Sequence, residues 1–280
     1  MRFLENIEDG NIVIKKMGII KALLVMFLSI LLEGFGQVPE EITNLFTGRF
    51  EKVVPYIIFI FGVLVKYYVI IILLKWFSIK VKERKLKRFL NFRSFAYTAL
   101  MIISFRLIFD NSLILWVSTI PMPDYINGAI QELSVSPIIL LLSVAVIAPV
   151  YEEILFRGIL LKGMANKLNP AVALVISALF FALVHMNIPQ GINAFLLGLV
   201  IGFIYLKTES IYLSIFAHFV NNFLALSVSS LFSLIEGKYA LETHGMFLII
   251  GIVLLFIACT GQNQNKIKEK PSIYKEFIEI

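Results

Sequence analysis

The sequence predicts an all-α membrane protein in which about eight transmembrane helices surround a polar intramembrane cavity. The first observation is composition: 59% of the 280 residues are hydrophobic and only 16% are charged, whereas soluble domains carry about 25% charged residues. The second is a mean hydropathy of +0.88. A bilayer accepts apolar side chains all round a helix, but a soluble domain cannot bury so many. The third is the recurrence of apolar stretches long enough to cross about 30 Å of hydrocarbon.

Eight apolar stretches are the expected spans. Because their number is even, both termini are expected on one side of the membrane. The basic residues cluster in the stretch 80–93, in the N-terminal segment and in the C-terminal tail. Lys and Arg concentrate in cytoplasmic loops, so this side is predicted to be the cytoplasm. The expected limits of the spans are 17–36, 54–77, 96–118, 136–161, 170–187, 191–206, 210–232 and 246–260.

The basic stretch 80–93 also divides the chain. It separates an N-terminal two-span region, 1–95, from a six-span core, 96–260, which a cytoplasmic tail, 261–280, follows. The N-terminal residues are mixed in charge, and the apolar run after them has no small-residue cleavage site. We therefore expect the first apolar stretch to be a retained span and not a signal peptide.

The charge and the cysteine content exclude several classes of protein. The net charge of +6 is explained by the basic residues of the segments that are expected on the cytoplasmic side. The basic residues do not form a face with interleaved aromatics, which excludes nucleic acid as a partner and leaves the lipid bilayer. The only cysteine, Cys259, lies in an apolar run. One cysteine rules out an intrachain disulfide and a cluster of thiolate metal ligands, so we interpret Cys259 as a buried hydrophobic residue.

The fourth span carries charged groups where a bilayer disfavours them unless they are paired or hydrated. On a helix Glu153 and Arg157 are i and i+4 and can form an ion pair, whereas Glu152 points about 100° away. Glu152 therefore has no partner on its own helix, and a desolvated carboxylate of this kind can act as a general base. Pro149, just before the pair, removes a helix hydrogen bond and permits a kink with local hydration.

Two of the three histidines lie in the apolar spans that follow. His185 stands near the far end of the fifth span, with Phe181 one turn before it and able to pack against the imidazole. In the seventh span His218 and Asn222 are i and i+4 and share a face. That pair can hold helices together or donate to a developing oxyanion. A shared polar cavity is the simplest account of polar groups on three neighbouring spans.

The remaining polar residues of the spans are interpreted as structural. Arg106 and Asp110 are i and i+4 in the third span and are predicted to form an ion pair. Lys66 and Glu33 can pair or extend toward the membrane surface, and they are given no role. The third histidine, His244, is placed in an outer loop and interpreted as solvated.

Three motifs in these spans match a known pattern. The pattern EExxxR, FxxxH and HxxxN, each in a hydrophobic helix, is present here as EEILFR (152–157), FALVH (181–185) and HFVNN (218–222). Together they resemble the CAAX-protease and bacteriocin-processing family, CPBP or Abi, which includes the Rce1-type prenyl proteases. The resemblance covers about 136–232, with every motif residue present and in order. The N-terminal spans carry no recognised motif.

The resemblance implies an eight-helix intramembrane endopeptidase, which is a hydrolase. Glu152 would act with His185 to activate a water molecule. His218 and Asn222 would then stabilise the tetrahedral oxyanion. The expected span limits place His185 roughly 5–10 Å deeper than Glu152, an offset that helix tilt or an earlier start of the fifth span would remove. The side chains expected to support this site are Glu153, Arg157 and Phe181.

The family has also been described as metal-dependent. Glu152, His185 and His218 could ligate zinc by their chemistry. We expect glutamate catalysis with no required cofactor, although the label metalloendopeptidase is used for the family. The HExxH, GxSx and paired GxGD motifs of other intramembrane proteases do not occur in the sequence.

The expected substrate is a membrane-associated peptide or protein, either a prenylated CAAX-type chain or another peptide precursor. The alternative is a non-catalytic membrane protein of the same scaffold that acts in bacteriocin self-immunity or regulation. A transporter also has buried charges, but the sequence shows no inverted repeat. The Ile-, Lys- and Phe-rich composition favours a bacterial plasma membrane as the location.

Overall fold

The computed structural model describes residues 2–34, 53–81, 90–124, 136–232 and 240–264. Within them a helix lies at each of the eight predicted positions. Most of the basic stretch 80–93 and most of the tail 261–280, on which the predicted orientation rests, lie outside the described residues. The helices are α2 (Ile19–Gly34), α4 (Val54–Phe77), α5 (Phe92–Asp110), the long helix Pro137–Ala165, α11 (Pro170–Leu183), α12 (Ile188–Thr208), α13 (Ile211–Phe232) and α14 (Ala240–Gln264).

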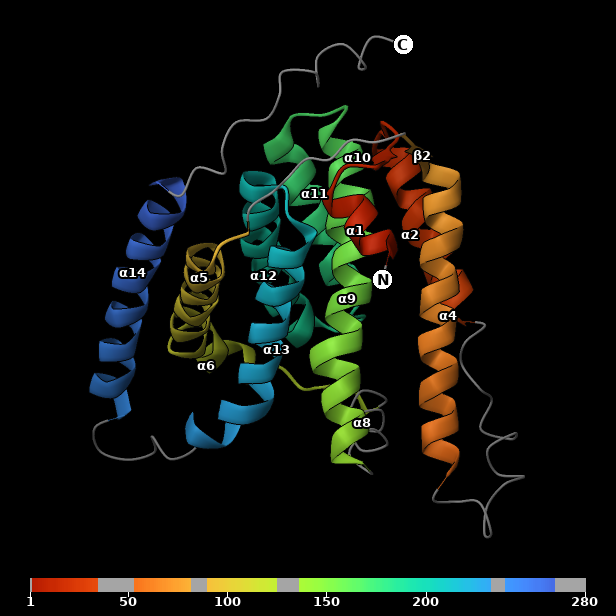
Figure 1. Cartoon of the computed structure of the whole chain (residues 1–280). Coiled ribbons are helices and arrows are strands. Elements are labelled where there is room, and N and C mark those ends of the chain that lie inside the picture. The colour runs from red at the N-terminus through yellow and green to blue at the C-terminus, as the bar shows by residue number, and fades with distance from the viewer. Residues whose placement is uncertain (1, 35–52, 82–89, 125–135, 233–239, 265–280) are drawn as a thin grey trace.

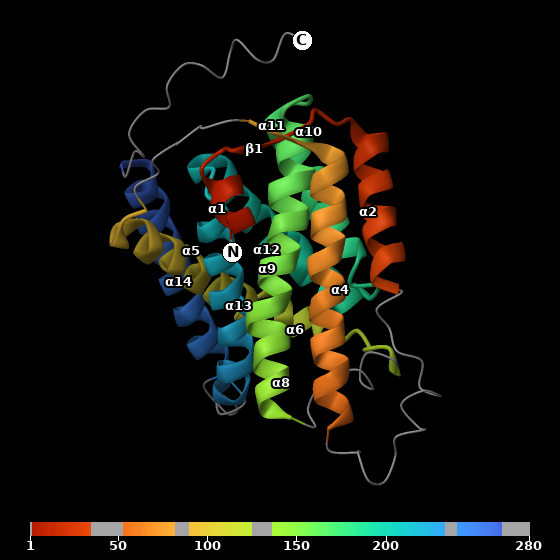
Figure 2. The same ribbon diagram turned by 45° about the vertical axis from the view of Figure 1, so that its right-hand side comes forward.

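The helices run side by side in one bundle (Figure 1). The long helix lies between α13 and α4, while α5 and α14 pack at one side (Figures 1 and 2). In Figure 2, α2 lies next to α4 at the other side. Five of the described helices are long and apolar enough to cross a membrane: α4, α5, Pro137–Ala165, α12 and Leu241–Gly261 of α14. The chain is thus an all-α polytopic membrane protein. The count of eight spans stays a prediction, because α2, with 16 residues, α11 and the apolar part of α13 are shorter.

The long helix contains two segments in the π-helical hydrogen-bond register. It consists of α8 (Pro137–Leu141), the π-helix η1 (Leu142–Ile147), α9 (Ala148–Glu153), the π-helix η2 (Ile154–Leu161) and α10 (Lys162–Ala165). Single π-turns inside α-helices often mark functional sites. Here the two π segments flank the single α-helical stretch that ends in the glutamate pair.

Helices α11 and α12 form a hairpin that differs from the two separate spans predicted for this region. Helix α11 ends at Leu183, four residues before the predicted limit, and α12 starts at Ile188, three residues before the predicted start. In the turn between them Met186 has a φ of 55°. Gly198 lets the two helices approach closely, because a Cβ at this position would lie 3.2 Å from the Cα and Cβ of Ala178.

The N-terminal residues form structure that the sequence did not predict. Helix α1 (Arg2–Glu8) precedes strand β1 (Ile12–Ile14), which pairs antiparallel with β2 (Ser78–Lys80) just after α4. The segment continues onto the core, where the Met17 backbone N–H donates to the Gly163 carbonyl at 2.9 Å. The N-terminal region and the core are therefore joined through this end of the bundle.

In the core, a short helix, α6 (Leu113–Val117), follows α5.

Candidate active site

A buried ionic network joins the long helix to α13. Arg157 donates from Nη1 to Oε1 of Glu153 at 2.9 Å, which confirms the predicted i, i+4 ion pair. The same oxygen lies 2.7 Å from Nδ1 of His218 on α13. The exposed fractions of Glu153 and Arg157 are 0% and 1%. Groups so far from water persist only as partners of one another, so the network fixes α13 against the Glu pair.

The ring of Phe181 is the centre around which this network packs. The Arg157 guanidinium carbon lies 4.6 Å from the ring centroid, in the position of a cation–π contact. The imidazoles of His218 and His185 both stand edge-on to the ring, with centroid separations of 5.6 Å and 5.1 Å. This confirms the predicted packing of Phe181 on His185. It also places both intramembrane histidines against one aromatic ring, which the sequence could not show.

The hydrogen bonds of His218 assign its tautomer. A carboxylate only accepts, so Nδ1 carries the hydrogen that is donated to Glu153. In the neutral ring Nε2 is then the acceptor, and it lies 3.7 Å from Oε2 of Glu152. Two acceptors that face each other at this distance need a proton or a hydrogen-bond donor between them. Glu152 is 24% exposed, and it is therefore the carboxylate of the pair that solvent or substrate can reach.

Asn222 compensates for the backbone hydrogen bond that Pro149 cannot make. In the π register of η1 the Ala148 backbone N–H donates five residues back to Ser143, so the next donor, to Val144, would be the nitrogen of Pro149. Proline has no N–H. The Nδ2 group of Asn222 on α13 donates to the Val144 carbonyl instead, at 2.8 Å. One of the two Nδ2 hydrogens of Asn222 thus holds the helices together, and the contacts of the described residues give no acceptor for the other.

His185 lies in the α11–α12 turn and not within a helix. Its Nδ1 donates to the Phe181 carbonyl at 2.8 Å, which leaves Nε2 as an acceptor. The described contacts include no ion pair between His185 and Glu152. The turn itself is held by Asn187, whose Nδ2 donates to the His185 carbonyl at 2.7 Å. The histidine next to Glu152 is therefore His218, a neighbour that the sequence did not offer.

The donor set does not converge on a metal position. Both imidazoles donate from Nδ1 and leave Nε2 open, as metal-binding histidines often do. However, the described residues contain no group of three or more His, Cys, Asp or Glu that could hold a metal ion. His218 lies between the two glutamates. His185 packs edge-on against the ring of Phe181 and belongs to the turn after α11. The three candidate zinc ligands Glu152, His185 and His218 thus do not fit a zinc site in this arrangement.

A second polar cluster lies beside the first, between the long helix and the two N-terminal helices. Glu33 of α2 accepts from the Lys66 ammonium at 2.7 Å and from the Tyr151 hydroxyl at 2.6 Å. The Lys66 nitrogen also lies 4.8 Å from the centroid of the Tyr151 ring. Pairing of Glu33 with Lys66 was one of the two predicted alternatives, but Tyr151 was missed. A tyrosine in an apolar run gives no signal of its own, although its position directly before Glu152 could have suggested a partner.

Two structural predictions away from the site have opposite outcomes. Arg106 and Asp110 form the predicted ion pair at 2.8 Å. The placement of His244 in a solvated loop is wrong, because the residue lies in α14 and its Nδ1 bonds to the side-chain oxygen of Asn111 at 2.8 Å. The predicted span started at residue 246, whereas α14 starts at Ala240.

Comparisons with known proteins match the motif region. Residues 134–224 match the family model described as type II CAAX prenyl endopeptidase Rce1-like. A curated protein of Bacillus subtilis (strain 168), YdiL, whose name describes it provisionally as a membrane peptidase, is 31% identical over 86 residues. That match covers 31% of this chain and spans about a third of the relative's own length, 35%. No solved structure matches.

Proposed function

We propose that this chain, which belongs to the Rce1-type family of membrane proteases, is an intramembrane endopeptidase that hydrolyses a peptide bond with an activated water. The observation that carries the proposal is the difference between the two neighbouring carboxylates. Glu153 is fully buried and bonded to Arg157 and His218, whereas Glu152 is partly exposed and faces a histidine nitrogen that can accept a proton. A general base needs this combination of access and a fixed partner.

In the proposed reaction Glu152 takes a proton from a water molecule as the water oxygen attacks the carbonyl carbon of the substrate. The carbonyl oxygen becomes the oxyanion of a tetrahedral intermediate. The donors proposed for it are the second Nδ2 hydrogen of Asn222 and Nε2 of His218, which would hold the proton that lies between it and Glu152 while Glu152 acts as the base. The C–N bond then breaks, and Glu152 returns its proton to the leaving nitrogen. The open Nε2 of His185 would accept the second hydrogen of the attacking water.

The buried part of the network would hold these groups in place. Glu153 fixes the tautomer and the ring orientation of His218, as a carboxylate does for a catalytic histidine. Arg157 neutralises Glu153 and donates from Nη2 to the Gly198 carbonyl at 3.3 Å. Phe181 separates the two imidazoles. Because the candidate ligands do not converge, no step in this mechanism uses a metal.

The proposed substrate is a membrane-associated peptide or protein, and a prenylated CAAX-type chain is one candidate. The fact that the family match is to CAAX prenyl endopeptidases supports that candidate. The similarity to a Bacillus protein supports a bacterial plasma membrane as the location. Cytoplasmic termini are part of the same proposal and rest on the distribution of basic residues.

The proposal can be tested with the full chain reconstituted in liposomes. Two probes are offered, a farnesylated peptide that ends in a CAAX sequence and an unprenylated hydrophobic precursor peptide, and products are identified by mass spectrometry. We expect cleavage of at least one probe, unchanged by a zinc chelator. Cleavage that stops with the chelator and returns with zinc would contradict the metal-free mechanism. No cleavage of either probe by folded protein would favour the non-catalytic alternative of an immunity or regulatory protein.

A further inference from the structure

A carboxylate from the N-terminal segment holds the first turn of α13. Oε2 of Glu8 accepts the backbone N–H of Ile211 at 2.8 Å, across 203 residues of sequence. Glu8 is only 5% exposed. The first N–H groups of a helix have no partner within the helix, and a carboxylate there also interacts favourably with the helix dipole. A nearby donor is satisfied locally, since the Leu213 N–H donates to Oγ of Ser210 at 3.3 Å.

Ile211, whose N–H bonds to Glu8, lies in the first turn of α13 on the same helix face as His218 and Asn222. His218 is seven residues after Ile211 and Asn222 is eleven after it. At 100° per residue all three fall within about 20° of one stripe. The Ile211 side chain also packs onto η2, where its Cδ1 lies 3.6 Å from the position of a Cβ on Gly158. Because a helix moves as a rigid rod, a shift of α13 at Ile211 would also move His218.

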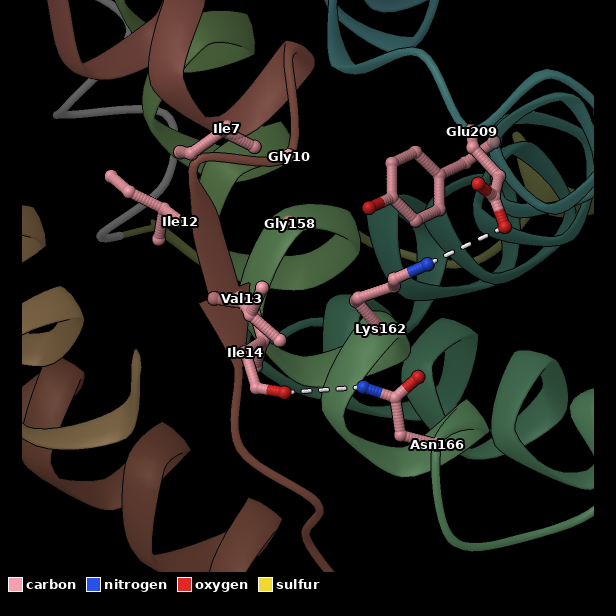
Figure 3. Close-up of a pocket in the computed structure, with 10 residues that line it drawn as sticks. Ile7, Gly10, Ile12, Val13, Ile14, Gly158, Lys162, Asn166 and Glu209 are labelled. Atoms are coloured by element: carbon pink, nitrogen blue, oxygen red, sulfur yellow. Dashed lines mark hydrogen bonds and ion pairs between the residues drawn. The ribbon is translucent and has the colours of Figure 1, made fainter. Parts of the chain in front are cut away.

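The N-terminal segment that carries Glu8 is also attached to α4 and to the long helix. At the start of α1 the ring of Phe3 packs edge-on against Tyr67 of α4, with centroids 6.2 Å apart. After α1 the chain forms β1, and the Ile14 carbonyl accepts from Asn166 of the core at 3.1 Å. Figure 3 shows this N-terminal segment passing over Gly158, Lys162 and Asn166. The partly open pocket there, about 30 Å³ in volume, has room for only about two water molecules, so the segment is packed onto the core.

We propose that Glu8 is a positioning residue of the proposed peptidase. It sets the place of α13 relative to η2 and so the approach of His218 to Glu152 and Glu153. Its role differs from that of Ser210. Ser210 caps α13 from the adjacent residue and moves with it, whereas Glu8 ties α13 to a separate part of the molecule. This inference rests on the proposed function for its effect on turnover, but not for its effect on the helix.

The experiment compares Glu8→Ala with Ser210→Ala in the full reconstituted chain. Hydrogen exchange is measured for amides 211–214 and for the η2 segment 154–161, together with kcat and KM on the cleaved probe. Both variants are expected to speed exchange at 211–214 about five- to ten-fold, which is the effect of losing one helix cap. Only Glu8→Ala is expected to speed exchange in 154–161 and to lower kcat, about ten-fold, with KM within about two-fold. Glu8→Gln keeps an acceptor oxygen and is expected to restore both.

Two results would overturn the inference. One is a Glu8→Ala protein with wild-type exchange and turnover; the other is a Ser210→Ala protein that loses as much turnover as Glu8→Ala. If Glu8→Ala does not accumulate in membranes, Glu8→Asp takes its place, since its carboxylate is one methylene short of Ile211. If the wild type cleaves neither probe, the proposed function fails by itself. The exchange of 154–161 in the two variants then decides whether Glu8 positions α13.

Discussion

Two polar clusters meet on neighbouring faces of the same helix and differ in how they are protected from their surroundings. In the core network Arg157 and Glu153 are 1% and 0% exposed, and they are enclosed by Phe181 and His218. In the N-terminal cluster Lys66 and Glu33 are 35% and 30% exposed. Both clusters contain one carboxylate, one cation and one aromatic ring. From this comparison we expect burial, and not the list of groups, to decide how much each contact contributes to stability.

Removal of Arg157 is expected to have the largest effect on stability. In Arg157→Ala the fully buried Glu153 and its histidine lose their cation, and breaking a buried pair from one side costs about 3–5 kcal/mol. Unfolding of purified protein in detergent, followed by titration with denaturing surfactant, measures the loss. Arg157→Ala with Glu153→Gln should be less unstable than Arg157→Ala alone, because no buried charge is then left unpaired. A single variant as stable as wild type would remove the distinction between the clusters.

Asn222→Ala is expected to cost less, about 1–2 kcal/mol, because one interhelical hydrogen bond to the Val144 carbonyl is lost. The same surfactant titration measures it. A second substitution links the cost to the proline. In a Pro149→Ala background the helix can supply its own N–H to this carbonyl, so Asn222→Ala should then cost less than in wild type. Equal costs in the two backgrounds would show that Asn222 does not replace the missing backbone donor.

Tyr151→Phe removes only the hydroxyl that donates to Glu33, and the expected cost is about 1 kcal/mol. Glu33 keeps Lys66 as a partner, so no carboxylate is left without one. Thermal unfolding in detergent micelles gives the change in midpoint, with Tyr68→Phe as a matched control on the exposed surface of α4. A loss as large as that of Arg157→Ala would mean that the N-terminal cluster is as tightly coupled as the core network.

Lys66→Met is expected to have the smallest effect, because Glu33 keeps the Tyr151 hydroxyl as a donor and methionine retains most of the apolar contacts of the lysine side chain. The surfactant titration used for Arg157→Ala measures it. A loss as large as that of Arg157→Ala would contradict the assignment of different environments to the two cations.

Contacts between residues within one helical turn could be predicted from the sequence, whereas contacts between residues far apart in the chain could not. The Glu153–Arg157 and Arg106–Asp110 pairs lie within one helical turn, and the i, i+4 rule was sufficient for them. The bond between His218 and Glu153 depends on the register between two helices, which a single sequence does not contain. The same reason hides the Glu8–Ile211 contact and the β1–β2 pair, whose partners are many residues apart.

Helix limits account for most of the remaining differences. His185 was expected within a span, but α11 stops at Leu183 and a turn follows in which Asn187 caps α12. The hydropathy pattern placed the end of this span at residue 187, inside the turn, because Met186 and Ile188 are apolar. The π-helical segments were equally hidden, since a hydropathy pattern does not report the hydrogen-bond register of a helix.

The most direct test of the account compares Glu152→Gln with Glu33→Gln. Each substitution removes one carboxylate from the membrane-embedded part of the chain, and each is assayed on the probe that the wild type cleaves, at matched amounts of folded protein. Glu152→Gln is expected to lower the rate of hydrolysis by at least about 100-fold, the usual contribution of a general base, while Glu33→Gln stays near the wild-type rate. Folded Glu152→Gln protein that cleaves the probe as fast as wild type would contradict the assignment of Glu152 as the catalytic base.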